Sequence, residues 1–280
     1  MLAPRSYLYV PGDRPDRMAT AAGRGADALV LDLEDAVAVH AKGSARRAVA
    51  EFLATAPDGP ELWVRVNADL LDEDVAAVAM AACTGILLPK AEPELLLEAH
   101  EALCRAELAR DLVPGTFGVV PLVETPRGIV DVVRLAEGPR VRRMGIGEAD
   151  LAAALGLRPG PDRAELAPHR AMLVVASAAA GRPAPIAPVE TDLTLDDATL
   201  AERTRALLRE GFRARTAIHP RQVPVLNAVF TPTAEEVAEA RDVVDRLAGT
   251  GSGVGLDRRG RLIDEAIARS ARDVLARQRR

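Results

Sequence analysis

Short apolar segments of β type alternate with helical segments along most of this chain of 280 residues. Turn residues bound the apolar runs, and segments rich in alanine, leucine and charged residues lie between them. This alternation is typical of βαβ units built on a parallel sheet, and eight of them favour a barrel over an open sheet. We expect strands within residues 6–10, 28–35, 62–67, 85–90, 119–123, 143–151, 185–187 and 217–220.

The predicted fold is an α/β protein, a (β/α)8 TIM barrel over residues 1–230 with a C-terminal helical lid extension over residues 231–280. The chain slightly exceeds the roughly 250 residues of a typical barrel, which leaves room for that extension. Residues 233–247 predict an amphipathic helix that begins with Thr-Ala-Glu-Glu. Residues 249–255 hold four glycines without the Gly-Lys-Ser/Thr of a phosphate loop, so they predict a flexible hinge. A short segment at residues 261–265 and a basic helix follow.

Composition excludes several classes of function. A net charge of −5 and only 2% aromatic residues give little basis for binding nucleic acid. No apolar stretch approaches the roughly 20 residues needed to span a bilayer, and no signal peptide precedes Arg5. We therefore expect a cytoplasmic enzyme with no membrane partner.

Two carboxylates follow consecutive predicted strands. Glu124 ends the apolar run at residues 119–123, and Asp150 follows the short run that contains Gly145 and Gly147. Adjacent strands lie about 5 Å apart, so both carboxylates can bind one hard divalent cation such as Mg²⁺, with water and substrate oxygens completing the shell. The alternatives are that Glu124 only caps the next helix and that the second motif is only a tight turn. Its pattern is not a dinucleotide fingerprint, because Asp150 replaces the third glycine.

Other polar residues end the remaining predicted strands. Arg65 suits an anionic oxygen of a substrate or a developing enolate. Asp32 and Glu34 share parity along one strand, and acids inside a barrel are usually paired, here with Arg65 or Lys90. We expect Lys90 to pair with an acid such as Glu34 or Glu92 and not to form a Schiff base. His219, which precedes a proline, is more typical of a hydrogen-bonded turn than of a catalytic residue.

Eight blocks in the correct order give the chain a resemblance to a known family. They run from about Arg5 to the C-terminus, and their order and number make the resemblance specific. The chain resembles the HpcH/HpaI aldolase/citrate lyase family, and within it the citrate lyase β-subunit-like proteins. The blocks are SYLYVPGDRPDRM from Ser6, ALVLDLEDAV from Ala28, Lys42 with Arg46, VRVN from Val64, LPKAE from Leu88, VETPRG from Val123, GEADL from Gly147 and AIHPRQV from Ala217.

The resemblance implies a Mg²⁺-dependent barrel enzyme that makes or breaks a carbon–carbon bond between an acyl-thioester enolate and a 2-oxo acid. By position it implies that Glu124 and Asp150 bind the metal, with Glu124 also facing the substrate, and that Arg65 binds the substrate. It further implies that Asp264 lies in a lid segment that enters a neighbouring subunit's site, in a homo-oligomer that is a trimer. Asp264 can instead simply cap the helix that follows it. Arg14 and Lys42 are candidates for binding the phosphates of a coenzyme A thioester, although Lys42 can also be a solvated residue at a helix start.

The chain departs from the family pattern in one loop. Relatives usually read Ile-Asp-Gly before a Tyr-Thr-Asp run, whereas this chain has Ile-Ala-Pro-Val-Glu-Thr-Asp at residues 186–192. Three functions stay open: a free-standing lyase or thioesterase of the malyl-CoA or citramalyl-CoA type, the β-subunit of a citrate lyase complex that acts on an acyl-carrier-protein thioester, and a non-catalytic scaffold or regulatory subunit. The intact set of Arg65, Glu124 and Asp150 argues against the third.

Overall fold

The computed structural model describes residues 3–56, 59–250 and 253–278, and these form two compact units, Pro4–Asn227 and mainly Ala228–Arg280. The sequence-based boundary after residue 230 stays a prediction of domain organisation. Eight parallel strands of the first unit close into a barrel in sequence order, and β8 pairs with β1 through Ala217 and Leu8. The predicted (β/α)8 fold is confirmed. The strands are β1 Ser6–Pro11, β2 Ala28–Asp32, β3 Glu61–Arg65, β4 Gly85–Leu88, β5 Gly118–Val123, β6 Gly145–Ile146, β7 Ile186–Ala187 and β8 Ala214–Ala217.

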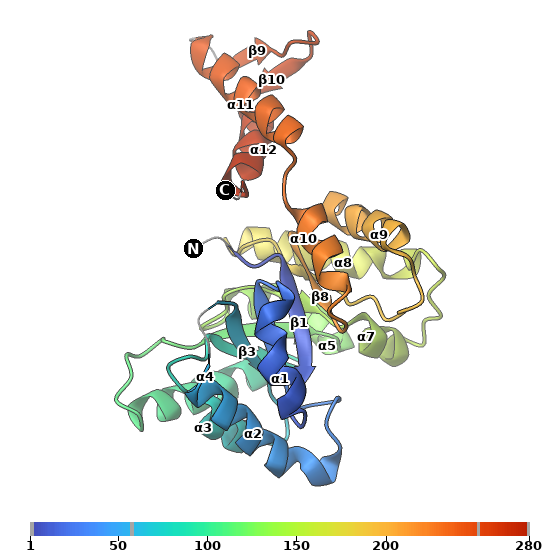
Figure 1. The fold of residues 1–280 in the computed structure, drawn as a ribbon. Coiled ribbons are helices and arrows are strands. Elements are labelled where there is room, and N and C mark those ends of the chain that lie inside the picture. The colour runs from blue at the N-terminus through green and yellow to red at the C-terminus, as the bar shows by residue number, and fades with distance from the viewer. Residues whose placement is uncertain (1–2, 57–58, 251–252, 279–280) are drawn as a thin grey trace. The chain divides into compact units, whose positions relative to one another are not determined.

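Helices connect the strands (Figure 1). Thr125 caps α5 by accepting a hydrogen bond from the Gly128 amide, and Arg14 holds the cap position of α1. The helices of this region are α1 Pro15–Ala21, α2 Lys42–Ala54, α3 Leu71–Val78, α4 Pro93–Leu108, α5 Pro126–Val130, α6 Val132–Glu137, α7 Glu148–Leu155, α8 Ala167–Ala179, α9 Asp197–Arg209 and α10 Gln222–Phe230, with short 3-10 turns η1 Ala22–Arg24, η2 Val39–Ala41 and η3 Ala164–Leu166.

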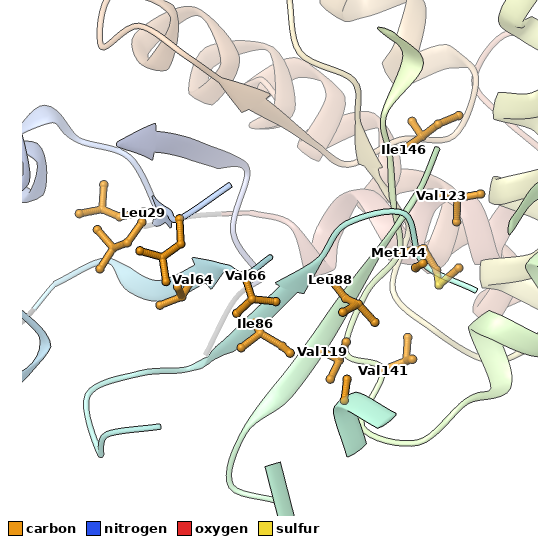
Figure 2. Packing of buried hydrophobic residues seen from close by; sticks show 14 of the residues in the cluster. Leu29, Val64, Val66, Ile86, Leu88, Val119, Val123, Val141, Met144 and Ile146 are labelled. Atoms are coloured by element: carbon orange, nitrogen blue, oxygen red, sulfur yellow. The ribbon is translucent and has the colours of Figure 1, made fainter. Parts of the chain in front are cut away.

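Two apolar clusters divide the strand residues by parity. The larger cluster joins strand residues such as Leu29, Val64, Ile86 and Val119 to buried helix residues, and Figure 2 shows part of this packing. The smaller cluster consists of strand residues alone and fills the barrel interior, since alternate side chains of a barrel strand point inward. Its members are Tyr7, Ala28, Val30, Trp63, Leu87, Val120, Leu122, Ile186 and Ala214.

The inward parity carries the site residues to one end of the barrel. Asp32 continues the inward series of Ala28 and Val30, Arg65 follows Trp63, and Glu124 follows Val120 and Leu122. All three stand at or just beyond the carboxyl ends of their strands. This is the end at which barrel enzymes hold their active sites.

Several predicted strands differ from the observed ones in their bounds, β2 and β8 among them. Strand β2 stops at Asp32, because the Asp32 carboxylate accepts hydrogen bonds from the amides of Glu34 and Ala36 and turns the chain. Strand β8 occupies Ala214–Ala217 and not residues 217–220. Its second residue, Arg215, is a buried arginine, and a charged residue in mid-strand breaks the apolar pattern on which the prediction relied.

The C-terminal unit holds α11 Ala234–Gly249, β9 Val254–Leu256, β10 Leu262–Asp264 and α12 Glu265–Ala276. Thr233 and Glu236 form the predicted capping box at the start of α11. The hinge expected over residues 249–255 is only partly described: 251–252 lie outside the described residues, and Gly249 belongs to α11. Val254 and Gly255 belong to β9, which pairs antiparallel with β10, so this part of the prediction is wrong.

Candidate active site

A cavity of about 940 Å³ opens at the carboxyl ends of the barrel strands. Of the site residues that the sequence singled out in this unit, Arg65, Glu124 and Asp150 line it together, whereas Arg14 and Lys42 do not; Asp264 belongs to the C-terminal unit. All eight barrel strands contribute residues to its wall. The polar and apolar lining residues include Tyr9, Asp32, Arg65, Leu122, Glu124, Asp150, Thr216 and His219.

Glu124 is held firmly at the tip of β5. Its side chain is only 4% exposed, and its Oε1 accepts a hydrogen bond of 2.7 Å from the Lys90 amide. A Cβ on Gly147 would meet Glu124 Oε2 at 1.9 Å, so only glycine allows the carboxylate to lie against this backbone. Burial, with the negative charges of Asp150 and Glu34, raises the pKa of Glu124 to about 7, against the opposing Lys90 amide and Arg65.

Asp150 reaches the same cavity from the next unit. Strands β5 and β6 are adjacent, with Leu122 paired to Gly145 and Val123 to Ile146. Asp150 does not end a strand, however, because β6 has only two residues and α7 begins at Glu148. Asp150 therefore stands exposed in the first turn of α7, where the helix dipole favours a negative charge.

The donor set of this pair suits a hard cation. The described residues contain no group of three or more histidine, cysteine, aspartate or glutamate side chains arranged to hold a metal ion, so they offer no closed zinc-type site. Mg²⁺ commonly uses one or two carboxylates and keeps water or substrate oxygens in its other positions. The negative charge of Asp150 contributes to the raised pKa of Glu124. A cation bound between the two carboxylates would relieve this repulsion.

Arg65 is fixed by three acids. Its Nε and Nη2 donate to Asp32 at 2.7 and 2.6 Å, and its Nη1 lies 2.9 Å from Glu34 and 3.3 Å from Asp35. The guanidinium also lies over the ring of Tyr9, 5.0 Å from its centre. Burial opposes the charge, but the hydrogen bonds to Asp32 and its charge outweigh it, so the pKa of Arg65 rises above its usual value. The predicted pairing of the barrel acids with Arg65 is confirmed.

Lys90 is bound to Glu34, as predicted. Its Nζ lies 2.5 Å from Glu34 Oε1. The hydrogen bond to Glu34 raises the pKa of Lys90, which keeps the amine protonated and unsuited to attack a carbonyl. The pKa of Glu34 is itself raised by burial, against the effects of Lys90 and Arg65.

Arg14 and Lys42 have protein partners outside the cavity. Exposed Arg14 pairs with Asp16 at 2.7 Å, and Lys42 Nζ donates to the carbonyls of Leu33 and Glu34 at 2.7 and 2.6 Å. Lys42 thus holds the turn after β2 in place instead of being merely solvated. The coenzyme A contacts of both residues stay a prediction.

Asp264 occupies the N-cap of α12. Its Oδ1 accepts a hydrogen bond of 3.0 Å from the Ile267 amide, which is the capping role that the sequence allowed. The lid role is not excluded by a cap and stays a prediction. His219, likewise, has the turn role that was expected, because its Nδ1 accepts from the Arg221 amide, yet it also lines the cavity.

The sequence model of the HpcH/HpaI aldolase/citrate lyase family matches residues 5–220, most of the chain. The chain belongs to this family. A citrate lyase subunit beta of Leuconostoc mesenteroides subsp. cremoris is 30% identical over 97% of this chain and 92% of its own length. A (3S)-malyl-CoA thioesterase of Cereibacter sphaeroides is 34% identical over 83% of this chain and 79% of its own length.

A solved family member has the same fold over nearly its whole length. The structure of CitE from Mycobacterium tuberculosis in complex with magnesium, acetoacetate and coenzyme A has a TM-score of 0.80, is 32% identical, and covers 98% of both chains. No helix in the described part of the present family member combines the length and apolar character needed to cross a membrane.

Three arginines that the sequence did not single out also line the cavity: Arg17, Arg24 and Arg163. Arg17 lies in α1 and Arg24 in η1, and both are exposed. Arg163 lies in the connection between α7 and α8. The sequence is unusually rich in arginine, which makes up 34 of its 36 basic residues. This bias does not mark particular positions, so it could not identify these three residues.

The unusual loop after β7 is ordered by a buried acid. Glu190 is 3% exposed and binds Arg163, Arg203 and Arg215. Ala187, Pro188 and Val189 border the cavity, where the family pattern would bring an aspartate and a glycine. The altered loop thus forms a defined wall of the cavity.

Proposed function

We propose that this protein is a Mg²⁺-dependent carbon–carbon lyase that cleaves a 3-hydroxyacyl thioester into an acetyl thioester and a 2-oxo acid. The observation that carries the proposal is the convergence of Glu124, Asp150 and Arg65 on one cavity at the carboxyl ends of the strands. Family membership supports the proposal, as do the magnesium and coenzyme A in the CitE complex from Mycobacterium tuberculosis.

The two carboxylates are assigned to the metal. Glu124 is fixed by the Lys90 amide and the Gly147 backbone, while Asp150 approaches from the first turn of α7. Mg²⁺ held there supplies a Lewis acid for the hydroxyl and carboxylate of the oxo-acid half of the substrate. Glu124, which lines the cavity, is also assigned to face that half of the substrate.

Arg65 is assigned to the thioester oxygen, on which negative charge grows as the carbon–carbon bond breaks. Its contacts with Asp32 and Glu34 fix its orientation before the substrate arrives. The proton that reaches the terminal carbon of the acetyl product is assigned to Asp264, presented by a neighbouring subunit of a homo-oligomer, which we take to be a trimer. Arg14 and Lys42 remain the proposed contacts for the coenzyme A phosphates.

A second activity has a specific observation in its favour. The (3S)-malyl-CoA thioesterase of Cereibacter sphaeroides is 34% identical, so hydrolysis of the thioester is a candidate activity of the same site. The similarity to citrate lyase subunit beta keeps open an acyl-carrier-protein thioester in place of coenzyme A.

A substrate panel tests the proposal. Purified protein is incubated with Mg²⁺ or with a chelator and a set of 3-hydroxyacyl-CoA esters, and the products are identified by mass spectrometry. We expect Mg²⁺-dependent formation of a 2-oxo acid with acetyl-CoA, or with free coenzyme A where hydrolysis follows. Glu124→Gln and Asp150→Asn should abolish product, whereas Glu101→Gln, at an exposed position of α4, should not. Activity that survives chelation, or that survives in both metal-ligand variants, would contradict the proposal.

A further inference from the structure

Arg163 stands apart from the other cavity residues in its backbone. It adopts φ 52° and ψ 35°, the left-handed region that residues other than glycine seldom occupy. Such conformations persist where the surrounding structure imposes them, and they concentrate at functional sites. At Arg163 the surroundings are the cavity on one side and a cluster of buried charges on the other.

The side chain of Arg163 is fixed but not saturated. Its Nη1 donates to Glu148 at 3.1 Å and to the Val189 carbonyl at 3.3 Å, and its Nη2 donates to Glu190 at 3.4 Å. Its Nε donates to no residue in the part of the chain that the structure describes. The guanidinium therefore borders the cavity with donor capacity that the protein does not use.

The charges behind Arg163 do not cancel. We define the arginine cluster as Arg163, Arg170, Arg203 and Arg215 with their partners Glu148, Glu190 and Glu210. Four cations face three anions, which leaves one positive charge in the cluster. Burial lowers the pKa of Arg215 to about 10, against the opposing negative charges of Glu190 and Glu148, and repulsion by Arg163 acts in the same direction as burial.

The cluster lies next to the metal-binding pair. Glu148, which binds both Arg163 and Arg170, is the first residue of α7, and Asp150 follows in the same turn. Gly147, against which Glu124 packs, immediately precedes Glu148. A ligand bound at Glu124 and Asp150 thus has a fixed guanidinium in the wall of the same cavity.

We infer that Arg163 forms an anion subsite that binds a second carboxylate on the oxo-acid half of the substrate. This inference rests on the proposed function, in which one carboxylate of that half is bound at the metal. The second carboxylate lies at the other end of the oxo acid and accepts hydrogen bonds from the unused donors of Arg163. The substrate class is then a thioester whose cleavage releases a dicarboxylic 2-oxo acid, and Arg163 is a specificity residue.

A pair of variants separates this role from a structural one. Arg163→Gly removes the cation at a position whose positive φ suits glycine, and Glu148 and Glu190 keep Arg170, Arg203 and Arg215 as partners. Arg203→Ala is the matched control. Arg203 binds the same Glu190 and is similarly exposed, 33% against 28% for Arg163, but it does not line the cavity.

Binding of oxaloacetate and of pyruvate is measured by calorimetry on the Mg²⁺-loaded protein, because these acids differ by one carboxylate. We expect the unmodified protein to prefer oxaloacetate. Arg163→Gly should weaken oxaloacetate binding about 10- to 100-fold, as expected for loss of a hydrogen bond to a charged group, and leave pyruvate binding within about twofold. Arg203→Ala should change neither.

The inference would be overturned if Arg163→Gly weakened binding of both acids equally, if it had no effect on oxaloacetate binding, or if Arg203→Ala caused an equal loss. In each of these cases Mg²⁺-dependent binding of pyruvate would still support the proposed function. If the unmodified protein binds neither acid with Mg²⁺, the proposed function fails and the subsite fails with it.

Discussion

The buried state of Glu124 predicts how Mg²⁺ affinity depends on pH. In the metal-free protein, burial and the neighbouring acids raise the pKa of Glu124 to about 7. The metal needs the ionised carboxylate, so binding must displace a proton wherever Glu124 is protonated. From about pH 8 to about pH 6 the ionised fraction falls from roughly nine-tenths to roughly one-tenth, which predicts a loss of about tenfold in affinity. A glutamate with the ordinary pKa of about 4.3 would give almost no change over this range.

Isothermal titration calorimetry tests this directly. Mg²⁺ is titrated into metal-free protein at several pH values in two buffers of different ionisation enthalpy, so that proton release is measured together with affinity. We expect close to one proton released per Mg²⁺ at the acid end and almost none at the alkaline end. An affinity that is flat with pH, without proton release, would refute the assignment of Glu124 as a buried metal ligand with a raised pKa. Glu101→Gln is the control, because this exposed α4 residue should not alter the pH profile.

Three further predictions follow from the same contacts. Because the folded-state pKa of Glu124 is raised, its contribution to stability is fully present below about pH 4 and is lost as pH rises through 7. Relative to the Glu124→Gln variant, the metal-free protein should lose on the order of 3 kcal/mol of unfolding free energy across that window in denaturant titrations. Curves of unfolding free energy against pH that run parallel in the two proteins would refute this prediction. Asp264→Asn should keep the cap of α12, and hence the melting temperature, but lower the catalytic rate about 10²–10⁴-fold if Asp264 is a proton donor. Mixing Asp264→Asn subunits with Glu124→Ala subunits should restore partial activity. Full activity of the Asp264→Asn protein by itself would exclude the lid role. Borohydride should trap no pyruvate on Lys90, whose amine is bound to Glu34; a Lys90 adduct with chelator-resistant activity would reverse this view.

The barrel was predictable because its signal is local. Runs such as residues 119–123 are apolar on both faces, and turn residues separate them from helices, so strand order followed from sequence order. The inward parity of Asp32, Arg65 and Glu124 then brought them to one mouth. Pairing of Lys90 with Glu34 could be expected because an acid in a barrel needs a partner.

The errors occur where long-range contacts decide the structure. Arg215 is buried in β8 only because Glu190, Thr204 and the Pro188 carbonyl, all distant in sequence, receive it. Val254 and Gly255, part of the glycine-rich stretch that locally indicates a hinge, belong to β9 and pair with β10. Arg163 carried no local signal, because its role depends on Glu148 and Glu190, which come from separate βα units.

The most direct test of the account is to locate the metal. Crystals grown with Mn²⁺ in place of Mg²⁺ and with a 2-oxo acid would show the ion through its anomalous scattering. The account predicts one strong peak within about 2.2 Å of carboxylate oxygens of both Glu124 and Asp150, with oxygens of the oxo acid in the same coordination shell. A peak bound by other residues, or the oxo acid bound in the cavity with no metal at these two carboxylates, would contradict it.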